Sequence, residues 1–195
     1  MWYNKGVARS PGDVSPVAWA RVFFMFQAGD LVVYGTAGVC RVESIHQPNK
    51  TGPDHHRKYC QLKPLYQDGV IYTPVENTKV SIRPVISRED AEHLIDLIPS
   101  MQAEAYRAPT LQALAQHCQT AVRSHNCQDL IELMMSIYAK QKQAESQKRR
   151  LGMVDERYMK QAERLLYGEF AIALELPVEE VQPCIAQRVD RAIAK

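Results

Sequence analysis

The chain has 195 residues, of which 46% are hydrophobic and 24% are charged, and this balance is enough to bury a core. No apolar run approaches the ~20 residues that a membrane-spanning helix needs, so a membrane protein is excluded. The five cysteines are odd in number and scattered, without a C-x-x-C pair. This pattern favours free thiols in a reducing cytoplasm over a disulfide framework or a zinc knuckle.

The net charge of +2 is spread thinly along the sequence. It amounts to +2 over residues 1–24, −1 over residues 25–99 and +1 over residues 100–195. No segment is basic enough to hold nucleic acid by bulk charge alone. Any contact with nucleic acid is therefore expected to be local.

The first 24 residues have neither a clear period nor the uninterrupted apolar stretch of a secretory signal. Met25 opens an ordinary domain start, MFQAGDLVVYG. We therefore expect residues 1–24 to be a disordered extension or the product of an upstream start codon, and we assign no function to them.

Short strands and turns dominate residues 26–85. Apolar strands at residues 31–34 and 39–45 flank a turn with two glycines, and further strands are expected at residues 59–65 and 70–74. Pro74 is expected to end the last of these strands or to place it at an edge. Together with a fifth strand, they are too few for a sandwich. The pattern predicts a small barrel of the SH3 or Tudor kind over residues 25–86.

Helical periodicity begins at Ser87, which resembles the start of a capping box. Apolar stripes follow over residues 111–122 and 130–138, the second after the expected cap Asn126. A polar segment, residues 140–150, then precedes a long helix expected to start at Asp155, and a last helix follows Pro177. The sequence predicts an α+β protein, with a β-barrel followed by an all-helical domain over residues 87–195.

Signatures of catalysis are missing from the sequence. It has no phosphate-binding G-x-x-x-x-G-K-[ST], no G-x-G-x-x-G after a strand, no H-E-x-x-H and no G-x-S-x-G. His55 and His56 are adjacent in a polar loop and poorly placed to chelate one ion, and Cys118 is expected in the core beside His117. We expect no enzyme, no metal, no cofactor and no small-molecule substrate.

One block of the sequence resembles a known family. Residues 26–39 read FQAGDLVVYGTAGV and resemble the F-x-x-G-D-x-V-V-Y opening of CarD-family bacterial transcription regulators. Residues 72–77 and 82–85 resemble the family's V-P-x-E-N and I-R-P-V segments, and residues 129–134 and 149–174 resemble its helices. The resemblance covers about residues 25–175, and the same β module opens the RNA-polymerase-interacting domain of transcription-repair coupling factors.

The resemblance implies that the barrel binds the β subunit of RNA polymerase by pairing strand to strand. In this mode main-chain hydrogen bonds supply affinity and alternate side chains supply specificity. The matching strands point to their polar, outward residues as the polymerase-binding set: Arg41, Glu43, Gln61 and Tyr72.

The resemblance also implies that the helical domain contacts promoter DNA at the upstream edge of the bubble, where the family places a tryptophan with basic neighbours. Here the tryptophan position falls on Leu111, and its neighbours become Gln112, Ala113 and Gln116. Leucine can still wedge a base step, and Lys148, Arg149 and Arg150 form the only basic run able to replace the lost phosphate contacts.

Two functions follow from these residues. The first is a non-enzymatic cytoplasmic transcription regulator whose barrel tethers a DNA-contacting helical domain to polymerase. The second is a polymerase-bound adaptor whose helical domain holds another protein and has lost DNA binding. The missing tryptophan favours the adaptor, whereas the basic run Lys148 to Arg150 favours DNA.

Overall fold

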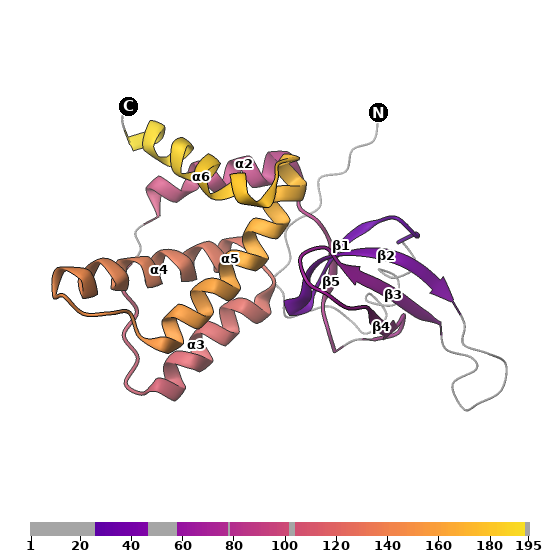
Figure 1. Ribbon diagram of the computed structural model, residues 1–195, viewed down its shortest axis with the longest axis horizontal. Coiled ribbons are helices and arrows are strands. Elements are labelled where there is room, and N and C mark those ends of the chain that lie inside the picture. The colour runs from indigo at the N-terminus through magenta and orange to yellow at the C-terminus, as the bar shows by residue number, and fades with distance from the viewer. Residues whose placement is uncertain (1–25, 47–57, 78, 102–103, 194–195) are drawn as a thin grey trace, which may run out of the picture.

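A computed structural model describes residues 26–46, 58–77, 79–101 and 104–193. In these residues a five-stranded antiparallel sheet precedes five α-helices, α2 to α6 (Figure 1), so the predicted α+β class is confirmed. The expected extension 1–24 and the pair His55–His56 lie outside the described residues. Within them, no helix is both long and apolar enough to cross a membrane.

The sheet has the strand order β4-β3-β2-β1-β5. Alternating apolar residues bury one face around Val32, Val42 and Leu62, each 0% exposed. A short 3-10 turn, η1 (Gly35–Ala37), joins the first two strands, with positive φ at Gly35 and Gly38 as the two-glycine pattern predicts. The strands are β1 (Leu31–Tyr34), β2 (Gly38–His46), β3 (Tyr59–Pro64), β4 (Ile71–Pro74) and β5 (Ile82–Pro84).

The helices begin at side-chain caps that the sequence announces. The Ser87 side chain accepts a hydrogen bond from the main-chain N–H of Asp90, and Asn126 caps α4 in the same way. The elements are α2 (Arg88–Leu97), the 3-10 turn η2 (Ile98–Ser100), α3 (Leu111–Ser124), α4 (Cys127–Ser146), α5 (Met153–Leu174) and α6 (Val178–Ile193).

Helix α5 is the centre of the helical part, packing against α2, α3, α4 and α6. Ala162 and Phe170 on this helix are 0% exposed, and Cys118 of α3 is buried in the same core as predicted. The burial of apolar side chains by α5 therefore holds the other four helices together.

The segment expected to be a polar linker is largely helical. Helix α4 continues to Ser146, and α5 begins at Met153, two residues before the expected start at Asp155. The polar residues are accommodated because they lie on the exposed side of α4, where the Gln141 side chain donates to Glu145 one turn later. Only residues 147–152 form the connection between the two helices.

Candidate functional site

One face of the sheet is polar and open to solvent. Gln61 on β3 is the cross-strand partner of Tyr72 on β4 and of Ser44 on β2, and Arg41 is the partner of Lys63. Cross-strand partners point to the same side of a sheet. Arg41, Ser44, Gln61, Lys63 and Tyr72 therefore share one surface, which we call the outer face.

Glu43 differs from the other three predicted polymerase-binding residues. The register between β2 and β3 shifts between Val42 and Ser44, so Glu43 is the extra residue of a β-bulge. Its side chain is exposed but has no partner in the β3 ladder. The structure thus brings Arg41, Gln61 and Tyr72 onto the outer face and leaves Glu43 in the bulge.

Strand β4 has an unpaired edge among the described strands. The N–H of Val75 donates to the C=O of Lys58 at 2.8 Å, and hydrogen-bonded pairs alternate along an antiparallel ladder. Thr73 and Ile71 are therefore the residues that bond to β3, while the main-chain N–H and C=O of Tyr72 face away from it. Pro74 lacks an N–H and its C=O accepts from Asn77 at 2.9 Å, so Tyr72 is the hydrogen-bonding centre of this edge.

The Tyr72 side chain is also presented to solvent. It is 61% exposed, and the His46 ring contacts it edge-on with 6.4 Å between ring centroids. A partner strand at this edge would thus meet both unpaired main-chain groups and an aromatic ring at one residue.

A buried ion pair joins the sheet to the helices. The Arg83 guanidinium on β5 forms a two-pronged interaction with the Glu169 carboxylate on α5, and the Nη2–Oε2 distance is 2.7 Å. Arg83 also donates twice to the C=O of His125, at 2.9 and 2.7 Å. Glu169 accepts further bonds from the N–H of Ile86 and the thiol of Cys127. We call these five residues the junction.

Electrostatics at the junction favour the ion pair. Burial alone would lower the pKa of Arg83, but the hydrogen bond and the negative charge of Glu169 outweigh it and raise the pKa. Burial and the nearby Arg83 charge lower the pKa of His125, whose Nδ1 is buried without a hydrogen-bond partner. The junction therefore stabilises a charged arginine beside a neutral histidine.

The lowered pKa of His125 predicts a pH dependence of folding stability. Because the folded value lies below the ordinary 6.5, His125 contributes stability that is present above about pH 6.5 and is lost as the pH falls. In His125→Asn this loss should shrink, since asparagine tolerates the φ of 55° and keeps the C=O that binds Arg83. Urea unfolding at pH 7 and pH 5 measures the difference. Exposed His93→Asn is the control, and equal pH dependence in both variants would contradict the assignment.

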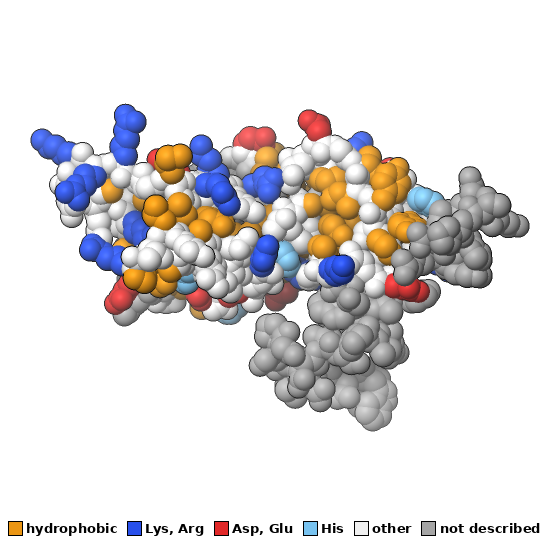
Figure 2. Space-filling view, turned by 90° about the horizontal axis from the view of Figure 1, so that it is seen from below, with side chains coloured by type: hydrophobic (Ala, Val, Ile, Leu, Met, Phe, Trp, Pro, Cys, Tyr) orange, Lys and Arg blue, Asp and Glu red, His pale blue; other side chains and the backbone are white. Residues whose placement is uncertain are grey.

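The predicted DNA-binding residues lie at the end of the helical part that is farthest from the sheet (Figure 1). Leu111 begins α3 and is 74% exposed, and Lys148, Arg149 and Arg150 are exposed in the turn before α5. Figure 2 shows Lys and Arg side chains gathered over this end. We call residues 147–152 with the first turns of α3 and α5 the tip.

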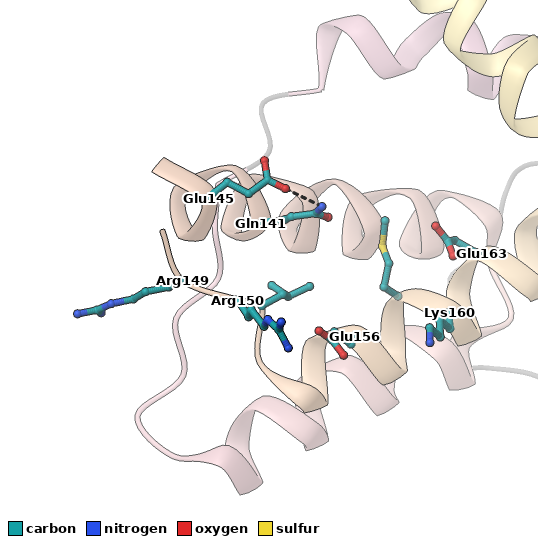
Figure 3. A pocket seen from close by; sticks show the side chains of 9 residues that line it. Gln141, Glu145, Arg149, Arg150, Glu156, Lys160 and Glu163 are labelled. Carbon is teal, nitrogen blue, oxygen red and sulfur yellow. Dashed lines mark hydrogen bonds between the residues drawn. The ribbon is translucent and has the colours of Figure 1, made fainter. Parts of the chain in front are cut away.

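The three basic residues of the tip are not equivalent. A hollow of about 370 Å³ is lined by Arg149 and Arg150 together with Glu145, Glu156 and Glu163. Figure 3 shows the Arg149 side chain extending away from the hollow and Arg150 pointing toward Glu156. Arg149 is therefore the better placed of the two for an external phosphate, because a neighbouring carboxylate offsets the charge of Arg150.

A family model identifies the N-terminal part. Residues 26–86 match the model of the CarD-like/TRCF RID domain, a stretch that contains all five strands. A comparison with curated proteins finds no match. The β domain is thus a protein-interaction module of the transcription machinery. More specifically, it is a CarD-like RNA-polymerase-interacting domain, which confirms the resemblance seen in the sequence over this stretch.

Proposed function

We propose that this protein is a non-enzymatic cytoplasmic transcription regulator that binds the β subunit of RNA polymerase and modulates the stability of the open promoter complex. The observation that carries the proposal is the match of residues 26–86 to an RNA-polymerase-interacting domain. The sheet would dock on polymerase, and the tip would contact DNA at the upstream edge of the bubble.

The open edge of β4 supports docking by strand addition. Tyr72 offers an outward N–H and C=O, whereas Pro74 does not extend the ladder, so the shared stretch would be short. A short strand pairing supplies few main-chain bonds. Side chains of the outer face, such as Arg41 and Gln61, would then supply specificity.

The junction supports action at a distance from the docking surface. The Arg83–Glu169 pair and the bond from the Arg164 side chain to the C=O of Thr36 tie the sheet to α5. A helical part held this way has a defined position once the sheet is docked. Its effective concentration at the nearby DNA is then high, and a weak DNA surface is sufficient.

The DNA surface at the tip predicts two opposite mutational effects. Replacing Lys148, Arg149 and Arg150 together with alanine should shorten the lifetime of the open complex, because phosphate contacts are lost. Leu111→Trp should lengthen it, because an aromatic ring stacks on a base with roughly 1–3 kcal/mol. The half-life of polymerase–promoter complexes after addition of a competitor measures both. A half-life unchanged in both variants would exclude DNA contact by the tip.

The adaptor is the second candidate function. It is favoured by the leucine at the tryptophan position and by the three glutamates around the hollow of the tip, which repel phosphate. A pull-down of the full chain with polymerase, with and without upstream-fork DNA, separates the two functions. Stronger retention with DNA supports the regulator, and identical retention supports the adaptor.

A further inference from the structure

Met153 is the most exposed large hydrophobic side chain of the described residues, at 87%. It is the first residue of α5 and follows the basic turn directly. Met153 makes no contribution to the helical core, whereas Val154 and Met159 on the same helix pack against it. Fold stability therefore does not explain an apolar side chain at this position.

The surroundings of Met153 are cationic. Arg149 and Arg150 precede it in the turn, and Arg157 lies one helical turn later on the same side of α5. None of these three arginines forms an ion pair with a described residue. An unburied methionine between uncompensated arginines is complementary to a polymer with apolar faces and a negatively charged backbone.

Leu111 provides a second exposed apolar residue at the same end. It begins α3, which packs against α5, and the two helices start on the same side of the helical part (Figure 1). After burial, the charge of Asp155 raises the pKa of the Cys118 thiol, which places the middle of α3 beside the first turn of α5. Leu111 thus extends beyond the start of α5, on the side where Met153 is exposed.

We propose that Met153 inserts into a base step of DNA at the upstream edge of the promoter bubble, with Arg149 and Arg157 on the flanking phosphates. The inference rests on the proposed function and adds the inserting residue. Methionine is among the apolar side chains that wedge between base pairs, and its unbranched thioether adapts to an irregular, partly unstacked surface. The proposal also accounts for the loss of the family's tryptophan, since Met153 and Leu111 would together replace its apolar surface.

The test uses the full chain bound to polymerase and a promoter that carries 2-aminopurine at successive positions of the upstream fork. Met153→Ser should reduce the fluorescence change at one or two adjacent positions and shorten the complex half-life by about threefold to tenfold, the loss expected for one exposed-to-buried apolar side chain. Met153→Leu should retain both signals. Val70→Ser is the matched control, because Val70 is an exposed apolar residue on the β domain.

The salt dependence separates insertion from charge. Met153→Ser should leave the dependence of the half-life on salt unchanged, whereas Arg157→Gln should lower the slope by about 0.9, the value for one phosphate. A salt slope that changes in Met153→Ser, or fluorescence signals equal to those of the unmodified chain, would overturn the proposal.

Two further outcomes separate this inference from the proposed function. If the Lys148, Arg149 and Arg150 triple variant shortens the half-life and Met153→Ser does not, DNA contact stands and insertion by Met153 is wrong. If neither variant has an effect, the DNA part of the proposed function fails as well. If Met153→Ser weakens binding to polymerase in the absence of DNA, Met153 contacts protein, and the inference is overturned.

Discussion

Replacing Glu169 with glutamine is expected to destabilise the chain by about 3 kcal/mol, because removing one partner of a buried ion pair leaves the other charge uncompensated. Glu169 is 2% exposed and Arg83 is 26% exposed, so the lower end of the usual 3–5 kcal/mol range applies. The corresponding decrease in melting temperature is about 6–12 °C for a protein of this size. Thermal and urea unfolding measure both quantities.

An exposed glutamate of the same chain provides the control. Glu92 forms ion pairs with Arg88 and Arg188, and its side chain is 40% exposed. Glu92→Gln should cost less than 1 kcal/mol, as surface pairs do. Combining Arg83→Met with Glu169→Leu should recover much of the loss, because an apolar pair needs no compensating charge. Equal effects of Glu169→Gln and Glu92→Gln would show that the junction contributes no special stability.

The same variant tests the tether. Glu169→Gln leaves Arg41, Gln61 and Tyr72 in place, so polymerase binding through the sheet should persist at temperatures where the sheet remains folded. The influence on open-complex lifetime should decline, because the helical part is no longer held in one position relative to the sheet. A variant that loses both activities together would indicate that docking itself requires the junction.

Local features of the fold are predictable because their causes are local. Gly35 and Gly38 supply the positive φ values that the turn requires, and Ser87 and Asn126 supply side-chain oxygens to the first helical N–H groups. The edge position of β4 follows from Pro74, which cannot donate to a further strand. Each of these expectations depends on residues within a few positions of one another.

The junction was not predicted, because Arg83 and Glu169 are 86 residues apart in the sequence. One signal was nevertheless present: Glu169 follows Leu165 and Leu166 in the apolar stripe of α5, where a carboxylate is rarely buried without a partner. The bulge at Glu43 had no such signal, since a register shift depends on the pairing of two strands. At the tip, the sequence supplied the basic run, but only the structure shows that Arg149 and Arg150 point in different directions.

Replacing Tyr72 with proline is expected to weaken polymerase binding by at least about tenfold, which corresponds to 1.4 kcal/mol. Proline removes the main-chain N–H that faces the open edge of β4 and leaves the bonds to β3 intact, since those come from Ile71 and Thr73. The loss comprises one hydrogen bond, about 0.5–1.5 kcal/mol, and the contacts of the ring. Calorimetric titration of the full chain with the polymerase β subunit measures the affinity.

Tyr72→Ala separates the main chain from the side chain, because it removes the ring and retains the N–H. Strand addition predicts that proline weakens binding more than alanine, whereas docking through side chains alone predicts equal losses. Lys63→Ala, on the outer face but away from the β4 edge, is the matched control and should change the affinity little. The melting temperature of each variant verifies that the sheet is folded. Wild-type affinity in Tyr72→Pro would rule out pairing at β4 and direct attention to the remainder of the outer face.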